Sequence, residues 1–402
     1  MKKGKFIVKK LPEVVFFQEG PGVRNNQYTN TGVKLLNVAN LQKGKVDLST
    51  SDRYISEEEA YGKYKHFLVD EGDLIIASSG IKVEYFEEKM GFISKDQLPL
   101  CMNTSTIRLK SLDVNVLNIR YFMYFLKSKL FKSQIARLIT GSAQLNFGPS
   151  HLKQIDVPII SIDEQKQIVA VLDKAQTIID KRKQQIQASD ELIKSQFIEM
   201  FGDILNNTKG WDMKALSEIS ELKSGGTPSR QNPEYFMGDI PWITTVALGK
   251  VTIDKEDAVE YITKEAIEKS ATKLIPANSL LFGTRVGVGK ISINKVPMCT
   301  NQDIVAIIGI DENRYNQVFL KNVIDSYSEY FNQQKRGATI QGIKSETLKN
   351  IAIPTVSIQL QNEFAQFVQQ VDKLKFEMEQ SLKQLEANFD SLMQKAFKGE
   401  LF

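Results

Sequence analysis

The sequence predicts an α+β protein with two tandem domains, each a mixed β-sheet with helices. Two long helices join the domains and are expected to form an antiparallel coiled coil with pseudo-two-fold symmetry. The main observation is a repeated passage, which begins at Gly141 and returns at Gly337 with a constant offset: 337 − 141 = 196, and 354 − 158 = 196 for its prolines. A run of glutamine, lysine and periodic apolar residues follows each copy. The order along the chain is therefore globule, helix, globule, helix.

The length fits this organisation, because 402 residues suit two modules of about 150 residues with their own cores, plus connecting helices. With 42% hydrophobic and 25% charged residues, the composition is that of an ordinary soluble protein. We expect four parts: an N-terminal domain, a central spacer helix, a C-terminal domain and a C-terminal spacer helix. They span residues 1–157, 158–205, 206–353 and 354–402.

Each spacer helix has a start signal and one apolar seam. Ser161 precedes Glu164 by three residues, which is the spacing of a capping box, and Ser357 repeats the cap. The apolar residues then step by three or four: Ile168, Leu172, Ala175, Ile179, Ile186, Ile193, Phe197 and Phe201 in the first helix, and Phe364, Phe367, Val371, Leu374, Met378, Leu382, Leu385, Phe389, Leu392 and Ala396 in the second. We expect the two seams to bury each other, with the helices antiparallel and one globule at each end. The alternative is that each helix packs on its own globule.

Strands dominate the first two thirds of each globule. Short β-branched runs bounded by turn residues predict strands at 33–38, 73–76, 104–109, 240–246, 279–282 and 304–308. Helices are expected next, over Ile119–Leu138 in the first copy and Gln317–Gln334 in the second. Each ends in a polar loop marked by a glycine.

The remaining composition excludes several classes of protein. Cys101 and Cys299 lie at matching places in the two copies, which predicts reduced core thiols. His66 and His151 are the only histidines, so a metal site is not expected. No apolar run approaches the roughly 18 residues that a membrane span needs, and we expect a cytoplasmic protein. A net charge of +4 permits nucleic-acid binding without proving it.

Several passages of the second copy are specific. Together with the duplicated passages, Ser224–Arg230, Asn232–Tyr235, Ile240–Ile243 and Leu280–Gly287 resemble the specificity subunits of type I restriction-modification enzymes, and the resemblance covers essentially the whole chain. It implies that two target-recognition domains each read half of a bipartite, asymmetric site in double-stranded DNA. It also implies that the helices dock two methyltransferase subunits and that restriction or translocase subunits join the full complex. S-adenosylmethionine, ATP and Mg would then be bound by those partners, and this chain would bind no cofactor.

The two copies differ where they are expected to contact DNA. The first has Gln18–Gly22 where the second has Ser224–Pro228, and Ala77–Gly80 where the second has Gly283–Val286. We therefore expect the two domains to read different half-sites.

The candidate DNA-binding residues are cations, amides and hydroxyls in these glycine-marked loops and at the helix ends that precede them. Arginine can donate to guanine O6 and N7, and lysine and backbone amides can contact phosphate. A tight turn or an ordinary surface loop remains the alternative at each place. The candidates are Arg24, Asn25, Asn26, Gln27, Tyr28, Lys82, Arg137, Ser142, Gln144, Gly225, Gly226, Thr227, Ser229, Arg230, Arg285, Lys290, Lys335, Arg336 and Thr339.

Three motifs that would indicate an enzyme are incomplete or weak. Glu234 interrupts an Asn-Pro-Pro-Tyr motif of amino-methyltransferases, and Ile291 follows Lys290 where a phosphate-binding loop needs Ser or Thr. Asp73 with Glu87, Glu88 and Lys89 imitates a metal-nuclease triad. We therefore expect a non-catalytic DNA-recognition subunit; a DNA nuclease with a duplicated DNA-binding domain and a helical scaffold unrelated to DNA remain the alternatives.

Overall fold

The computed structural model describes residues 6–80, 83–139, 147–336 and 342–402. It divides into two compact units, which we call unit 1 (Met1–Arg182 with Ser381–Phe402) and unit 2 (Lys183–Gln380). Each unit therefore includes a part of both long helices, whereas the sequence suggested four separate parts. That four-part division stays a prediction.

Unit 1 is built on a four-stranded antiparallel sheet with a smaller mixed sheet. The larger sheet has the order β2 (Val15–Glu19), β10 (Thr106–Ser111), β7 (Leu74–Ala77) and β8 (Met90–Phe92). The smaller has the order β6 (Tyr54–Ile55), β3 (Val33–Leu36) and β9 (Leu100–Met102), with β3 and β9 parallel. Two strand pairs complete the unit: β1 (Ile7–Lys10) with β11 (Asp156–Ile159), and β4 (Leu41–Gln42) with β5 (Lys45–Val46).

Unit 2 repeats the larger sheet, the smaller sheet and the first strand pair of unit 1, with one strand added to the larger sheet. Its larger sheet has the order β13 (Glu221–Ser224), β20 (Ile304–Ile308), β17 (Leu280–Gly283), β18 (Ile291–Asn294) and β15 (Thr252–Ile253). Its smaller sheet has the order β16 (Glu260–Ile262), β14 (Ile240–Ile243) and β19 (Cys299–Thr300), with β14 and β19 parallel. The pair β12 (Met213–Ala215) with β21 (Ala352–Pro354) matches β1 with β11. The duplication seen in the sequence is confirmed as a duplicated fold.

The two cysteines mark equivalent core positions, as predicted. Cys101 lies opposite Leu35 in the parallel pair of unit 1, and Cys299 lies opposite Trp242 in that of unit 2. Both thiols are free and fully buried. Burial raises the pKa of Cys101 to about 12 and that of Cys299 to about 11, so both stay protonated at neutral pH.

The helix predicted over Ile119–Leu138 is two helices, α3 (Ile119–Lys127) and α4 (Lys129–Leu138). Ser128 breaks it, because its backbone is extended and its hydroxyl accepts a hydrogen bond from the Phe131 amide at 3.3 Å, which starts a new helix. In unit 2 the predicted single helix is likewise α9 (Gln317–Ser326) and α10 (Ser328–Arg336). The polar loops after these helices lie outside the described residues. The other short helices are α1 (Leu11–Val14), α2 (Glu57–Tyr61), α5 (Pro149–Leu152), α7 (Leu216–Ile219), α8 (Lys264–Glu268) and α11 (Ser345–Lys349).

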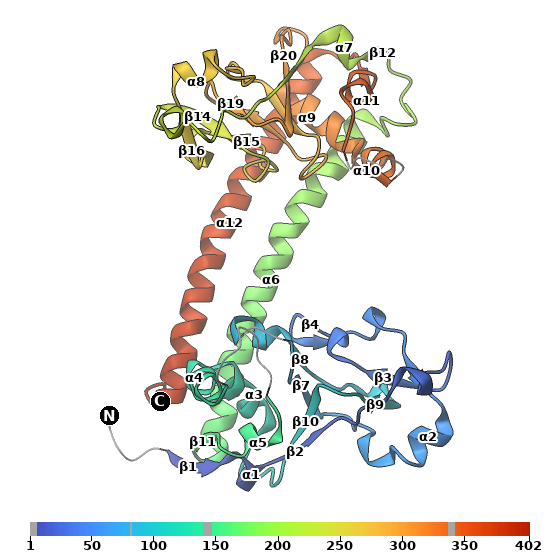
Figure 1. Cartoon of the computed structure of the whole chain (residues 1–402), viewed down its shortest axis with the longest axis vertical. Helices are drawn as coiled ribbons and strands as arrows, with labels where there is room; N and C mark the ends of the chain where they lie inside the picture. Colours follow the sequence, from blue (N-terminus) through green and yellow to red (C-terminus); the bar gives the residue numbers. More distant parts are fainter. Residues whose placement is uncertain (1–5, 81–82, 140–146, 337–341) are drawn as a thin grey trace. The chain divides into compact units, whose positions relative to one another are not determined.

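The long helices are α6 (Ile162–Phe201) and α12 (Ile358–Lys398), each one uninterrupted ribbon in Figure 1. Within unit 2, Phe201 packs on Phe364 with 5.5 Å between ring centres, and Lys375 forms an ion pair with Asp190. Asp190 of α6 meets Lys375 of α12, and the later residue Phe201 meets the earlier residue Phe364. The helices are therefore antiparallel, as expected. Both serine caps are present: the Ser161 hydroxyl accepts from the Glu164 amide at 3.3 Å, and that of Ser357 from Leu360 at 3.4 Å.

The apolar seam is confirmed over most of its length but is wrong at Leu374, whose side chain is 58% exposed. Lys375 lies one turn beyond the buried Val371 and takes the position that faces α6. The helices also pack on the globules, which was the alternative expectation: Ile168 and Leu172 of α6 belong to the core of unit 1. Within the described residues, no helix is both long and apolar enough to cross a membrane.

Candidate nucleic-acid interface

Each unit has an asparagine directly after the parallel strand pair. The Asn103 amide donates to Leu36 O, and the Asn301 amide donates to Ile243 O, both at 3.0 Å. A glycine packs against each asparagine so closely that a Cβ on Gly20 would lie 2.0 Å from Asn103 O, and one on Gly225 2.1 Å from Asn301 O. The loops that we paired from the sequence, 18–22 and 224–228, therefore occupy the same place in the two units.

In unit 2, Gly225 allows the loop backbone to lie close to the segment around Thr300 and Asn301. The Gly225 amide donates to Ile304 O at 3.0 Å, and the Gly226 amide donates to Thr300 O at 2.9 Å. Both glycines are buried. Their amides are thus used within the unit, and what they present outward is the exposed run that includes Thr227, Ser229 and Arg230.

Arg230 is the best-defined cation of this face. Its guanidinium forms a two-pronged ion pair with Glu260, whose second bond joins Nη2 to Oε2 at 2.8 Å. The group lies over the rings of Phe236 and Trp242, at 4.3 and 5.5 Å from their centres. The bond to Glu260 raises the pKa of Arg230, and Arg230 lowers the pKa of Glu260. Because the arginine side chain is 57% exposed, this pair contributes at most about 1 kcal/mol to stability and can be exchanged for another anion or acceptor.

Arg285 and Thr227 reach the same segment of unit 2. The Thr227 hydroxyl donates to the Gln302 side chain, and Arg285 Nη1 lies 3.9 Å from the Asp303 carboxylate. Gln302 and Asp303 directly follow Asn301. The structure thus brings Thr227 and Arg285 together around one loop, with Arg230 three residues beyond Thr227.

Lys290 belongs to a neighbouring turn. Gly287 and Gly289 have φ angles of 63° and 84°, in the left-handed region that favours glycine. The Lys290 amide donates to Gly287 O at 3.0 Å and closes the turn. The glycines are therefore explained by the turn, while the Lys290 side chain is exposed.

In unit 1 the predicted run from Arg24 to Tyr28 divides into two groups. Arg24, Asn25 and Asn26 are exposed around a 3-10 turn. Gln27 instead anchors this turn, because its Nε2 donates to Glu59 at 2.7 Å and to the Tyr64 hydroxyl at 3.1 Å. Its side chain is therefore engaged within the unit.

A residue that the sequence analysis missed lies beside Tyr28. Arg53 Nη1 donates to the Tyr28 hydroxyl at 3.4 Å, and its guanidinium lies 5.2 Å from the centre of the Tyr28 ring. The same hydroxyl accepts from Asn103 Nδ2 at 3.4 Å, and Asn103 Nδ2 also donates to Asn37 Oδ1 at 2.8 Å. Arg53 is exposed, whereas Asn103 is buried. Nothing in the local sequence distinguishes Arg53, because only the register of β6 places it here.

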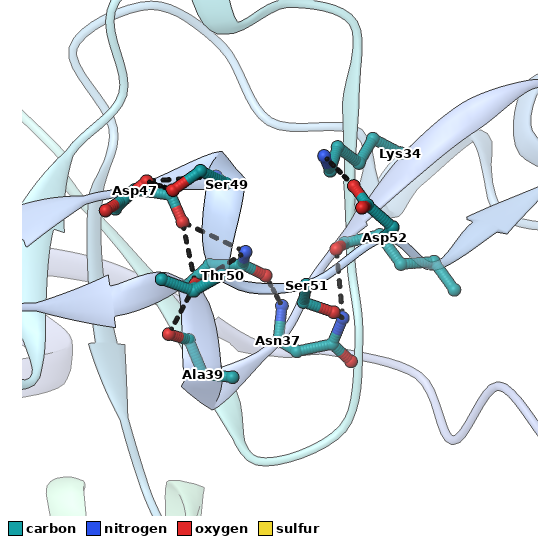
Figure 2. A network of polar contacts seen from close by, with 10 residues as sticks. Lys34, Asn37, Ala39, Asp47, Ser49, Thr50, Ser51 and Asp52 are labelled. Atoms are coloured by element: carbon teal, nitrogen blue, oxygen red, sulfur yellow. Dashed lines mark hydrogen bonds and ion pairs between the residues drawn. The ribbon is translucent and has the colours of Figure 1, made fainter. Parts of the chain in front are cut away.

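A polar network fixes the adjoining loop of unit 1 (Figure 2). Asn37 Nδ2 donates to the Ser51 hydroxyl at 3.3 Å, and the Thr50 hydroxyl donates to Ala39 O at 2.7 Å. Lys34 donates to Asp52 at 2.9 Å, which raises the lysine pKa. Because Asn37 also binds Asn103, the network continues to Tyr28 and holds this polar surface in one arrangement.

The other candidates are not brought to these clusters. Arg137 is exposed in the last turn of α4, where it lines a groove of about 2230 Å³ together with residues of β1 and the end of α12. Lys335 and Arg336 end α10, and their side chains are not described. Lys82, Ser142, Gln144 and Thr339 lie outside the described residues.

The groups of the imitated nuclease triad have structural partners. The buried Asp73 carboxylate accepts from the Asp70 amide at 2.8 Å and pairs with Lys110 at 3.2 Å and Arg108 at 3.5 Å. Burial is the largest influence on this carboxyl and raises its pKa. Glu87 pairs with Lys132 at 3.3 Å. Asp73 and Glu87 are thus engaged by other partners, and the nuclease interpretation is not favoured.

The family model described as type I restriction modification DNA specificity domain matches residues 4–188 and again residues 208–387. The chain belongs to this family. The resemblance inferred from the sequence is therefore confirmed, and the two matched ranges are two specificity domains in tandem.

Two relatives of this chain are named as specificity subunits of type I restriction enzymes. The MjaIX specificity subunit of Methanocaldococcus jannaschii is 32% identical over 175 residues, 43% of this chain and 40% of that protein. The EcoR124I/EcoR124II specificity subunit of Escherichia coli is 30% identical over 226 residues, 54% of each chain. The matched part thus spans about half the length of these relatives.

Two solved structures share the fold over nearly their whole length. The S subunit from M. genitalium is 16% identical, with a TM-score of 0.53 and coverage of 98% of this chain and 97% of that one. A chain from a study of complex assembly and conformational transition of the type I R-M system is 16% identical, with a TM-score of 0.62 and coverage of 99% and 98%.

Proposed function

We propose that this chain is the sequence-specific DNA-binding subunit of a type I restriction-modification complex and reads a bipartite, asymmetric site in double-stranded DNA, one half with each unit. One observation carries the proposal. The same fold occurs twice, and at the same place it carries different polar side chains: Arg230 with Glu260 in unit 2, and Arg53 with Tyr28 and Asn103 in unit 1. Guanidinium, amide and hydroxyl groups are those that distinguish base edges.

The long helices supply the proposed contacts with two methyltransferase subunits. Within unit 2, four large apolar side chains of α6 and α12 are at least half exposed: Leu192, Ile198, Leu374 and Phe376. Exposed apolar groups on these helices favour contacts with another protein. Replacing Leu374 and Phe376 together with serine should abolish co-elution of the chain with its methyltransferase subunit, while Leu112→Ser, an equally exposed change in unit 1, should not. Co-elution that survives the double change would refute a contact through these two side chains.

In this proposal the chain is non-catalytic and acts in the cytoplasm. S-adenosylmethionine, ATP and Mg would be bound by the methyltransferase subunits and by restriction or translocase subunits. The alternative, a DNA nuclease with a duplicated DNA-binding domain, would need free carboxylates, whereas Asp73 is engaged by Lys110 and Arg108.

Two experiments test the function. Sequencing of modified bases in cells that carry the chain and its methyltransferase should give one bipartite methylated motif, and a single continuous motif would contradict two reading units. The purified chain alone, incubated with duplex DNA and magnesium, should leave the DNA intact. Cleavage would show that the nuclease alternative is correct.

A further inference from the structure

The registers of the two small sheets make Arg53 and Glu260 equivalent. In unit 2, Glu260 lies opposite Trp242, which lies opposite Cys299. In unit 1, Leu35 lies opposite Cys101, and the Leu35 amide donates to Arg53 O at 2.8 Å. Arg53 directly precedes β6 and continues its pairing with β3, so its position corresponds to that of Glu260 in β16. Unit 1 has a cation where unit 2 has a carboxylate.

Both units nevertheless present one guanidinium at this sheet edge. In unit 1 it belongs to Arg53 and lies over Tyr28; in unit 2 it belongs to Arg230, which Glu260 holds over Phe236 and Trp242. Both arginines are exposed. An aromatic ring below the planar group and a hydrogen bond at one side fix its orientation while leaving other N–H donors free for a ligand.

We propose that Arg53 is a specificity-determining residue of unit 1 and the counterpart of Arg230 in unit 2, and that each guanidinium reads a guanine in its half-site. The inference rests on the proposed function. A guanidinium held in one plane matches the two acceptors O6 and N7 that guanine presents in the major groove. Phosphate can also accept two hydrogen bonds from a guanidinium, but such a contact carries no preference for a base.

The unequal partners of the two arginines explain how the same place could read different bases. In unit 1 the guanidinium donates to the neutral Tyr28 hydroxyl, which the buried Asn103 holds in place. In unit 2 it stands beside the Glu260 carboxylate, which can accept from the N4 amino group of cytosine. The two half-sites would thus share a guanine contact and differ at its neighbours.

The test is selection of bound sequences from a randomised duplex library by the full chain, for the wild type and for Arg53→Ala and Arg53→Lys. The wild type should yield two half-motifs. Arg53→Ala should lose the preference for one guanine in one half-motif and keep the other half, with affinity for the wild-type site lower by about 10- to 100-fold. Arg53→Lys keeps the charge but loses the planar fork that stacks on Tyr28, so it should weaken the same preference without abolishing it. Arg120→Ala, which removes an equal charge beside α6, should keep both half-motifs.

Replacing that guanine with 7-deazaguanine gives a second measurement. Affinity should fall about 10-fold for the wild type and no further for Arg53→Ala. A complete motif bound more weakly at all sequences by Arg53→Ala would show a phosphate contact, and unchanged binding would remove Arg53 from the interface; either result overturns the inference alone. A wild-type chain that selects no motif would overturn the proposed function and the inference with it.

Discussion

Single side chains on the polar faces are held by weak, exchangeable contacts. Arg230 is exposed and rests on aromatic rings while it pairs with Glu260. Such a pair adds little to stability, because solvent screens it. In the proposed interface the pair would orient the guanidinium before DNA binds, and the pair itself has a measurable pH dependence.

The Arg230 pair should stabilise unit 2 slightly at neutral pH and not in acid. Arg230 lowers the pKa of Glu260 below its ordinary 4.5, so the contribution is complete above about 4.5 and is lost as the pH falls through the lowered folded value. We expect Glu260→Gln to reduce the free energy of unfolding by at most about 1 kcal/mol at pH 7, and by progressively less as the pH falls below about 4.5. Urea unfolding across this range measures it, with the exposed Glu265→Gln as control. A loss that persists at the acid end would indicate packing instead of charge.

The buried thiols should report the opening of each unit. Because burial raises the pKa of Cys101 to about 12 and that of Cys299 to about 11, thiolate is scarce at pH 8. In Cys299→Ala, where Cys101 is the remaining thiol, we expect a colorimetric disulfide reagent to react at least roughly 100-fold more slowly than with a free thiol. In Cys101→Ala, where Cys299 is the remaining thiol, we expect the same slow reaction. Rapid reaction in native buffer would contradict the closed cores.

Elements are joined by a buried glutamine that occurs in both copies. Gln165 of α6 donates to Val116 O at 2.8 Å and Ile160 O at 2.9 Å and accepts from the Asn118 amide at 2.8 Å. Gln361 of α12 repeats all three contacts with Arg314 O, Val356 O and the Asn316 amide. Both are fully buried. Each glutamine thus fixes the start of a long helix to the segment before α3 or α9.

Removing these glutamines should cost far more than removing exposed ones. Gln165→Leu leaves one buried and two partly buried backbone groups without this partner, and a fully buried group costs about 1–3 kcal/mol. We expect a loss of at least about 2 kcal/mol in unfolding by denaturant, and the same for Gln361→Leu. Gln167→Leu and Gln359→Leu, exposed neighbours on the same helices, serve as controls. Equal stability of Gln165→Leu and Gln167→Leu would exclude this role.

The elements also show what sequence reasoning can and cannot reach. Strands, serine caps and most of the seam follow from local periodicity and chemistry, so they could be predicted. The break at Ser128, the exposure of Leu374 and the role of Gln165 depend on partners that no local pattern specifies. Arg53 was missed for the same reason, since its place depends on the pairing of β6 with β3.

At the scale of the whole molecule, each unit has its own sheets and its own core, but both borrow parts of the same two helices. If residues 1–155 are exchanged for those of a relative, the new globule must therefore pack on the helices of this chain. Tyr121 and Phe125 pack on Phe397 of α12, and Tyr124 donates to Asp173 of α6 at 2.6 Å. A donor sequence must keep these contacts to fold.

We expect such a chimera, made with residues 1–155 of a relative that keeps these aromatic positions, to change one half of the methylated motif and preserve the other. The reason is that Arg53, Tyr28 and Asn103 all lie in the exchanged segment, whereas Arg230, Glu260 and Arg285 do not. Sequencing of methylated bases in cells gives the motif directly. The control is the same chimera with Tyr121→Ala, which removes a contact with α12. A misfolded chain should give no methylated motif at all, whereas altered recognition should change only one half of the motif. Loss of both specificities in a folded chimera would instead mean that the units read DNA through one fused surface.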